Sequence, residues 1–210
     1  MQPALNTRQE ALKELYLILA EFFKYPTKEF FEDLQGGTVE AEMNQWLEQA
    51  GIEHEPVKAS LFPLTFTELK QMHIELFSGI STDPVLPVES IYKIWTADRT
   101  AEIPIAGEKG YLYGDSALHM RRLFDRYGLE IPDSYEAAPD HLTLLLEFLA
   151  YLIEINAGSG QILQYMDDHM DWLPDFQRAL QNADESGPYV RIVTMLHNVA
   201  AIHRKHLEAV

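Results

Sequence analysis

The stretch Pro139–Asn156, PDHLTLLLEFLAYLIEIN, decides the fold class of this chain. Its leucines and isoleucines recur at intervals of three and four residues, which is the period of an α-helix. They cover more than one side of that helix, so the helix is expected to be central and buried. Pro139 suits a first helical turn, where its missing N–H loses no bond, and Gly158–Gly160 ends the pattern. The sequence therefore predicts a buried helix over residues 139–156.

The rest of the chain has the same helical period. Apolar residues at helical spacing, bounded by capping residues, glycines and prolines, predict further helices on both sides of the central one. No segment alternates apolar and polar residues as a half-buried strand would. We therefore predict an all-α protein, a single globular multi-helix bundle that occupies residues 1–210 as one domain. The other expected helices cover about residues 7–25, 27–36, 38–51, 65–79, 115–128 and 189–208, with two shorter ones that meet near 172–174.

The longest break in the helical pattern lies over residues 101–114, which include a proline and three glycines. Such a composition favours an irregular and mobile connection. A hinge within 101–114, or within the 128–138 connection, would permit the exchange of helices between two copies of the chain. We expect a monomer or a domain-swapped dimer.

The chain is strongly acidic. Of its 210 residues, 33 are Asp or Glu and 16 are Lys or Arg, which gives a net charge of −17. A surface of this charge repels phosphate backbones, which argues against a nucleic-acid partner. It suits a cationic partner instead.

The chain contains no cysteine, which excludes disulfides, cysteine–zinc sites, iron–sulfur ligation and thiol nucleophiles. Its longest apolar run, Leu142–Ile155, includes Glu147 and Glu154 and is too short to cross a bilayer. The first residues have no basic segment of the kind that opens a secretory signal. We expect a cytoplasmic protein without stable membrane insertion.

Asp140 and His141, at the head of the central helix, are the first candidate site. In one interpretation Asp140 caps the helix, where a carboxylate interacts favourably with the amide dipoles, and His141 is a half-buried spacer. In the other, both side chains point into a groove. Asp140 would then accept hydrogen bonds from a cationic ligand, and His141 would add a titratable contact.

The segment Pro87–Tyr92, PVESIY, is the second candidate, with Trp95 three residues further on. Glu89, Tyr92 and Trp95 can share one face if this segment opens a helix. A carboxylate beside aromatic rings is a good receptor for a guanidinium group, which pairs with the carboxylate and stacks on the rings. The alternative is helix capping by Glu89 or Ser90, with the two aromatic residues in the core.

A third group, Asp167, Asp168, His169 and Asp171, resembles a set of metal ligands. Consecutive carboxylates face different sides of a helix, and no Glu-x-x-His pairs are present to build a di-iron bundle. Helix capping and solvation are the expected roles of these residues. The sequence also has no phosphate-binding loop, dinucleotide fingerprint, nucleophile elbow or His-Glu-x-x-His motif. The residues alone thus indicate an acidic helical protein with two carboxylate–aromatic candidate sites.

Several segments, in order along the chain, resemble the TorD/DmsD/NarJ-like chaperones of molybdoenzymes. Leu86–Tyr92, LPVESIY, is similar to the family's proline–Glu-Ser–aromatic element. Tyr127–Leu129, Ala138–Leu142 and Leu146–Leu152 resemble the segments around its central helix. His169–Phe176, HMDWLPDF, is similar to its later His-x-x-Trp-x-Pro-x-Phe element.

The resemblance implies a TorD-like helical fold and a cytoplasmic chaperone without turnover chemistry, cofactor or metal. Such a protein binds the twin-arginine leader or the N-terminal segment of a molybdenum-cofactor oxidoreductase and assists cofactor insertion before export. Its partners would be the apo-molybdoenzyme catalytic subunit and its leader peptide. By the same resemblance, Asp140 and His141 match the family's leader-binding pair. Glu89 and Tyr92, next to Pro87, match its second binding element.

Two alternatives stay open. The client could be a non-exported, nitrate-reductase-like subunit whose N-terminus lacks the two arginines. The protein could instead be a metal-dependent helical hydrolase that uses Asp167, Asp168, His169 and Asp171. A nucleotide-handling role, which the family also suggests, has no supporting motif in this sequence.

Overall fold

The computed structural model describes residues 5–55, 57–79 and 84–209. Within these ranges the chain forms α-helices and two short 3-10 helices, and the one β-contact is an isolated bridge between Val88 and His141. The prediction of an all-α fold is confirmed. The helices are α1 (Thr7–Glu21), α2 (Lys28–Gly36), α3 (Thr38–Ala50), η1 (Ala59–Leu61), α4 (Phe66–Phe77), α5 (Glu89–Tyr92), α6 (Asp115–Tyr127), η2 (Asp133–Tyr135), α7 (Leu142–Glu154), α8 (Ser159–His169), α9 (Leu173–Ala183) and α10 (Pro188–Glu208).

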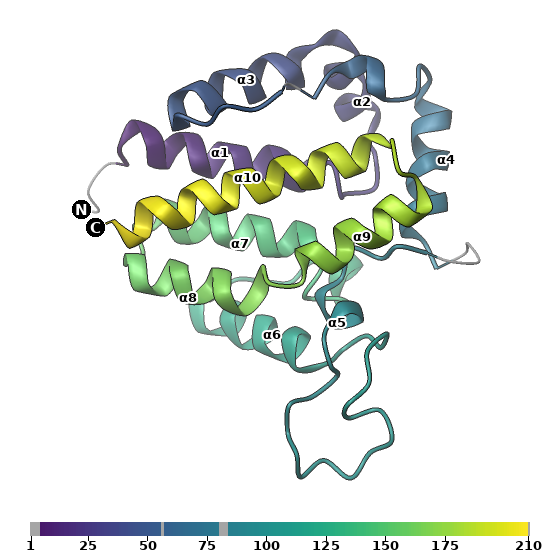
Figure 1. Ribbon diagram of the computed structural model, residues 1–210, viewed down its shortest axis with the longest axis vertical. Helices are drawn as coiled ribbons and strands as arrows, with labels where there is room; N and C mark the ends of the chain where they lie inside the picture. The colour runs from purple at the N-terminus through teal and green to yellow at the C-terminus, as the bar shows by residue number, and fades with distance from the viewer. Residues whose placement is uncertain (1–4, 56, 80–83, 210) are drawn as a thin grey trace.

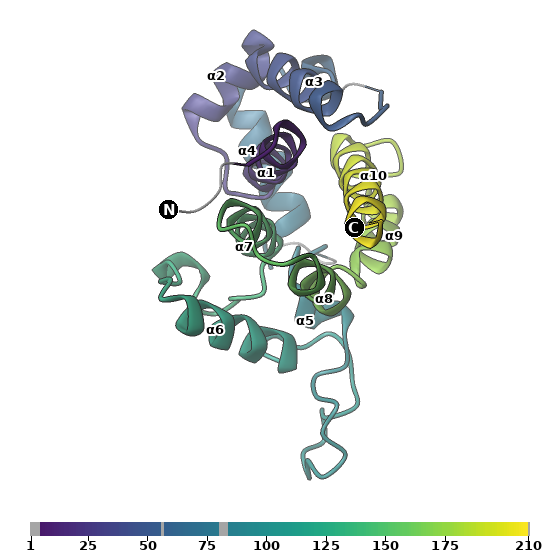
Figure 2. The ribbon, with the colours of Figure 1, turned by 90° about the vertical axis from the view of Figure 1, so that its left-hand side faces the viewer.

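Helix α7 lies at the centre of the bundle, as its leucine pattern predicts. Ten of its 13 residues are buried. It packs most extensively against α1, and α6 and α8 lie on its other sides (Figures 1 and 2). Helix α10 runs along α1, α8 and α9. Among the described helices, none combines the length and the apolarity needed to cross a bilayer.

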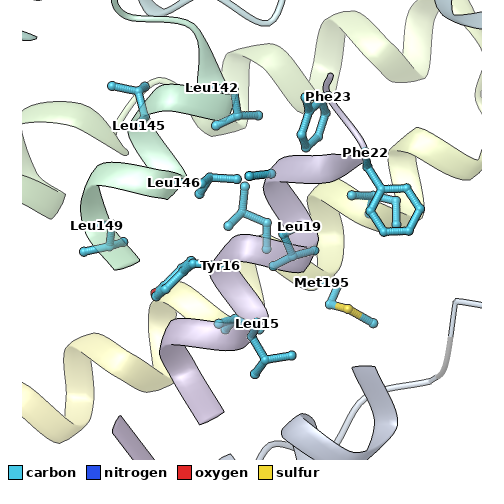
Figure 3. Packing of buried hydrophobic residues seen from close by; sticks show 14 of the residues in the cluster. Leu15, Tyr16, Leu19, Phe22, Phe23, Leu142, Leu145, Leu146, Leu149 and Met195 are labelled. Carbon is cyan, nitrogen blue, oxygen red and sulfur yellow. The ribbon is translucent and has the colours of Figure 1, made fainter. Parts of the chain in front are cut away.

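The contact between α1 and α7 forms the centre of the hydrophobic core (Figure 3). Leu19 of α1 lies beside Leu146 of α7, and these two side chains, like Leu15 and Leu145 on the same two helices, have no exposed surface. Complete burial of one leucine side chain contributes about 1.5–3 kcal/mol to stability. An aromatic cluster closes the core just after α1. There Phe23 contacts Phe77 of α4, Phe176 of α9 and Tyr189 of α10.

The start of the central helix differs from the prediction. Helix α7 begins at Leu142 rather than at Pro139, because His141 is its N-cap residue and accepts a hydrogen bond from the Thr143 amide at 3.2 Å. Pro139 and Asp140 form a turn, in which the His141 amide donates to the Ala138 carbonyl at 3.0 Å, and His141 itself is extended and pairs with Val88 before α5. The Leu142 amide donates to the Pro87 carbonyl at 2.8 Å, and the Glu89 amide donates to the Asp140 carbonyl at 3.1 Å.

A long loop, residues 93–114, connects α5 to α6 and extends away from the bundle (Figures 1 and 2). The predicted break at 101–114 lies within it. Backbone hydrogen bonds cross its base, from Trp95 N to Glu108 O at 2.8 Å, from Thr96 N to Ala106 O at 3.0 Å and from Asp115 N to Trp95 O at 2.8 Å. The loop is therefore irregular but tied at its base. A hinge there, or in 128–138, stays a prediction, as does helix exchange.

Replacement of Leu146 by alanine tests the position of the core. Leu146 is fully buried between α1 and α7, so Leu146→Ala should lower the free energy of unfolding by about 2–5 kcal/mol in urea denaturation. Leu64→Ala is the matched control, because Leu64 is 80% exposed and should change stability by less than about 0.5 kcal/mol. Equal losses in the two variants would contradict this packing.

Candidate functional site

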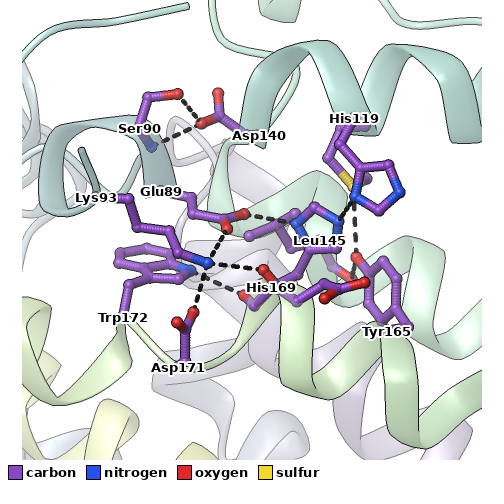
Figure 4. A network of polar contacts seen from close by, with 12 residues as sticks. Glu89, Ser90, Lys93, His119, Asp140, Leu145, Tyr165, His169, Asp171 and Trp172 are labelled. Atoms are coloured by element: carbon purple, nitrogen blue, oxygen red, sulfur yellow. Dashed lines mark hydrogen bonds and ion pairs between the residues drawn. The ribbon is translucent and has the colours of Figure 1, made fainter. Parts of the chain in front are cut away.

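The two predicted candidate sites are parts of one polar network. The bridge between Val88 and His141 places α5 beside the start of α7, so that Glu89, Ser90 and Asp140 lie together although they are far apart in sequence. Lys93 and the end of α8 complete the group (Figure 4). The structure thus joins segments that the sequence presents as separate motifs.

The Asp140 side chain is fully buried and bonded to Ser90. Its Oδ2 accepts hydrogen bonds from the Ser90 amide at 2.7 Å and from the Ser90 hydroxyl. Burial raises the pKa of the Asp140 carboxyl, and the Ser90 hydrogen bonds only partly offset this effect. Neither expected geometry for this residue is right. His141 caps α7 in place of Asp140, and the Asp140 side chain is enclosed in the fold, with Oδ2 bonded to Ser90 and Oδ1 without a hydrogen-bond partner among the described residues.

His141 is half-buried, and it caps α7 in place of Asp140. Its ring lies 5.0 Å from the ring of Tyr135, centroid to centroid. Burial lowers the pKa of His141 to about 3, with a smaller contribution from His73. The imidazole is therefore neutral near pH 7, and its Nδ1 can accept the Thr143 amide hydrogen bond. The expected contact of His141 with a ligand stays a prediction.

Glu89 is also fully buried, and its partners come from within the chain. Its Oε2 lies 2.7 Å from His169 Nδ1, and its Oε1 accepts a hydrogen bond from Lys93 Nζ at 3.0 Å. Burial by itself raises the pKa of Glu89, but His169 and Lys93 outweigh it and hold the pKa below its usual value. The carboxylate is therefore ionised and already paired. This differs from the expected open receptor for an external guanidinium group.

Lys93 connects the network to the turn between α8 and α9. Its Nζ contacts Asp171 Oδ1 at 2.7 Å and donates to the Asp168 carbonyl at 2.8 Å, in addition to Glu89. Burial lowers the pKa of Lys93, but the carboxylates of Glu89 and Asp171 outweigh it and raise the pKa. One ammonium group thus holds α5 against two other segments.

Glu89 and Tyr92 both lie in α5, but Trp95 does not share a helical face with them. Helix α5 ends at Tyr92, so Trp95 lies beyond it in the loop and donates its indole N–H to the Leu112 carbonyl at 3.1 Å. The Tyr92 ring stacks on Trp172 at 5.2 Å between centroids, with 22° between the ring planes. Burial raises the pKa of the Tyr92 hydroxyl. Pro87 takes part in the site through its carbonyl, which accepts the Leu142 amide.

The side chains proposed as alternative metal ligands diverge. Asp167 pairs with Arg204 at 2.6 Å, Asp171 pairs with Lys93, and His169 contacts Glu89. Within the described ranges, no group of three His, Asp or Glu side chains is placed to hold a metal ion. The structure does not bring these residues together as the hydrolase hypothesis requires.

Sequence reasoning missed three members of the network. The sequence suggests only a capping role for the Ser90 side chain, and Lys93 and His119 belong to no motif. His119 Nδ1 lies 2.9 Å from His169 Nε2, a contact between residues 50 positions apart. The one available signal is the spacing of Glu89 and Lys93, because residues four positions apart can form an ion pair on a helix. No local pattern could have indicated the His119 contact.

Comparison with known proteins identifies the family. A family model described as "Nitrate reductase delta subunit" matches residues 58–178, more than half of the chain. The chain belongs to the nitrate reductase delta subunit family. The matched region includes every residue of the polar network, from Pro87 to Trp172.

Curated relatives and a solved structure agree with this assignment. The chain is 29% identical over 133 residues to the "Chaperone protein TorD" of Vibrio cholerae serotype O1, a match that covers 58% of this chain and 54% of the relative. It is 26% identical over 141 residues to the TorD of Vibrio parahaemolyticus, with 61% and 59% covered. The chain spans about half the length of the curated relatives it matches. A solved structure of a redox enzyme maturation protein from Archaeoglobus fulgidus has the same fold, with a TM-score of 0.50, 23% identity and 99% and 98% coverage.

This member of the delta subunit family carries a patch of exposed apolar side chains beside the network. Of the seven large apolar residues that are exposed in the described ranges, five lie in the 93–114 loop or at the start of α6. Exposed apolar side chains concentrated in one segment are candidates for contact with another protein. We call this group the loop patch; it consists of Ile94, Ile103, Tyr111, Leu112 and Leu118, which are 38–46% exposed.

Removal of the Glu89 charge should destabilise the fold. Glu89→Gln leaves Lys93 and His169 without their buried carboxylate, so we expect a loss of about 3–5 kcal/mol in the free energy of unfolding at pH 7. Asp175→Asn is the control, because Asp175 forms ion pairs only with the exposed Lys109 and Arg178. It should cost less than about 1 kcal/mol. A small, equal effect in both variants would show that the Glu89 pairs are unimportant.

The pH dependence of stability should depend on His141. Because the folded pKa of His141, about 3, lies below its unfolded value near 6.5, the unfolded chain binds the extra proton first as the pH falls. Stability is therefore lost between about pH 6.5 and pH 3. His141→Asn keeps a helix-capping acceptor and cannot titrate, so its slope of unfolding free energy against pH should be lower by up to about 1.4 kcal/mol per pH unit. His54→Asn, in the segment after α3, controls for the loss of one histidine, and an unchanged slope in His141→Asn would refute the assignment.

Proposed function

We propose that this protein is a chaperone that binds the N-terminal segment of a molybdoenzyme catalytic subunit and assists its maturation. Its membership of the nitrate reductase delta subunit family supports the proposal, as do relatives named "Chaperone protein TorD". In this role the protein has no turnover chemistry and no cofactor of its own. Its partner is the apo-subunit in the cytoplasm, before cofactor insertion and export.

The observation that carries the proposal is the loop patch on an acidic protein. Exposed isoleucine, leucine and tyrosine side chains provide apolar contacts for a hydrophobic segment of a client. The net charge of −17 attracts basic residues that flank such a segment and speeds their encounter. A leader with arginines followed by an apolar stretch has both properties, and its apolar stretch can dock as a helix.

The buried candidate residues serve this function indirectly in our proposal. Asp140 holds Ser90, and the Ser90 hydroxyl accepts a hydrogen bond from the Gly114 amide at 3.3 Å, at the point where the loop returns to α6. Gly114 is tightly placed, since a Cβ there would lie 2.6 Å from the Trp95 carbonyl oxygen. We therefore assign Asp140 to loop positioning rather than to direct contact with the client.

Glu89, Tyr92 and His141 have the same proposed role, together with Pro87 and Trp95. Glu89 and Tyr92 fix α5, from which the loop departs. Pro87 and His141 take part in the bridge that aligns α5 with α7. Trp95 closes the base of the loop through its bond to Leu112, a member of the loop patch.

A second client class is favoured by the family description. The model that matches this chain is that of the nitrate reductase delta subunit, so a non-exported, nitrate-reductase-like subunit is an alternative client. Titration with a leader peptide in which Arg-Arg is replaced by Lys-Lys separates the two. Weaker binding of the altered peptide supports a twin-arginine client, and equal binding supports the alternative.

Substitutions in the loop patch test the proposed binding surface. Tyr111→Ser combined with Leu112→Ser should weaken binding of the client's N-terminal peptide at least tenfold in calorimetric titration, because apolar contact area is lost. Leu64→Ser is the matched control, since Leu64 is an exposed leucine outside the patch. Unchanged affinity in the double variant, or an equal loss in the control, would refute the loop patch as the client site.

A further inference from the structure

A chain of hydrogen bonds leaves the buried network toward α6. It runs from Glu89 Oε2 to His169 Nδ1 at 2.7 Å, and from His169 Nε2 to His119 Nδ1 at 2.9 Å (Figure 4). Glu89 and His169 are buried, whereas His119 is half-buried. These two hydrogen bonds thus connect a buried carboxylate to a histidine near the surface.

With a neutral His169, the order of donors and acceptors along this series of hydrogen bonds determines which nitrogen of His119 is a free acceptor. Glu89 is ionised and can only accept, so His169 donates its Nδ1 proton to it. In a neutral His169 the Nε2 atom is then an acceptor, and His119 must donate from its own Nδ1. This arrangement leaves His119 Nε2 with an unshared electron pair. Within the described part of the chain, that atom has no hydrogen-bond partner.

His119 lines a small pocket between α6, α7 and α8. The pocket has a volume of about 120 Å³. Asp168 lies on its α8 wall, and its carboxylate makes no ion pair or hydrogen bond with any other described residue. The rings of Tyr127 and Phe148 form part of the lining, Gln164 adds an amide, and Arg126 lies at the exposed edge.

We propose that this pocket binds a planar cation of the guanidinium class. The lining includes His119, whose Nε2 has no partner among the described residues, and Asp168, whose carboxylate is likewise unpaired among them, beside the aromatic residues Tyr127 and Phe148. A guanidinium group is flat, rich in donors and positively charged, and it stacks on aromatic rings while it pairs with carboxylates. The match between acceptors, rings and charge makes this class of ligand the best fit.

The size of the pocket agrees with such a ligand. An apolar cavity of about 150 Å³ in another protein accommodates benzene. A guanidinium group has fewer heavy atoms than benzene, so it fits a space of about 120 Å³. Larger ring systems would have to displace the side chains at the edge.

The charges around His119 make the affinity depend on pH. His169 and Asp168 face it from α8, Glu89 lies behind His169, and Arg122 belongs to α6 itself; the α7 residues of the pocket, Phe148 and Leu152, carry no charge. Burial lowers the pKa of His119 from its ordinary value, which favours the neutral ring near pH 7. Acidification would protonate it, remove its acceptor and repel a bound cation. Affinity should therefore decrease as the pH falls below about 6.5.

The experiment uses the full chain and methylguanidinium as the probe. Binding is followed by two-dimensional amide NMR at pH 7.5, with methylurea as the neutral probe of the same shape. We expect methylguanidinium to shift the signals of α6 and α8 around the pocket and to bind at least tenfold more tightly than methylurea. Equal affinities, or no shifts at these positions, would overturn the proposal.

Variants separate a cation site from an anion site. Asp168→Asn should weaken methylguanidinium binding at least tenfold, whereas Asp167→Asn, one residue earlier, should have no effect because Asp167 pairs with Arg204 outside the pocket. Arg126→Gln should strengthen binding, since it removes a like charge from the edge. The opposite pattern, in which inorganic phosphate binds and Arg126 is required, would overturn the cation assignment.

A second ligand identifies the source of the cation without relying on the proposed function. If Nα-acetyl-arginine amide binds at least tenfold more tightly than methylguanidinium, the natural ligand is an arginine side chain of a peptide. Equal affinity supports a free small cation in the same pocket. Because Asp168 lies outside the loop patch, failure of this proposal would leave the client-binding test with Tyr111 and Leu112 unaffected.

Discussion

The structure depends on the burial of two carboxylates, Glu89 and Asp140, where α5 meets the start of α7. An ionised carboxylate inside a protein is unfavourable unless hydrogen bonds and opposite charges replace its water. Here Lys93 and His169 form hydrogen bonds with Glu89, and Ser90 donates to Asp140. Ser90 and Lys93 belong to α5 and its C-cap, and His169 lies at the end of α8. The bonds to the two carboxylates therefore fix how α5 meets α8 and the start of α7.

The same contacts couple the core to the surface. Ser90 joins Asp140 to Gly114, and Lys93 joins Glu89 to the turn after α8, so the long loop starts and ends on buried anchors. An exposed apolar patch is useful for binding only if it is held in a fixed arrangement, because ordering a loose loop costs conformational entropy. In this account the carboxylates keep the loop patch ordered, while its apolar side chains make the contacts.

The sequence predicts the helices well and the site only in part. Leucine spacing is a local property, so Leu142–Glu154 could be identified as the central helix without knowledge of its neighbours. The motifs around Glu89 and Asp140 mark two segments that the structure brings together. Their orientation could not be predicted, because it depends on the bridge between Val88 and His141 and on Ser90, which are long-range pairings. His119 illustrates the limit most clearly, since its contact with His169 exists only in the folded arrangement of α6 and α8.

The most direct test of the positioning role is amide hydrogen exchange in a Ser90→Ala variant. Ser90 is the link between Asp140 and Gly114, and alanine removes both hydroxyl contacts without adding bulk. The account predicts faster exchange across residues 93–114 in the variant, with protection in α1 unchanged because that helix packs on α7 away from the link. Exchange in the loop that equals the wild-type rate would contradict the claim that the buried carboxylates hold the loop patch in place.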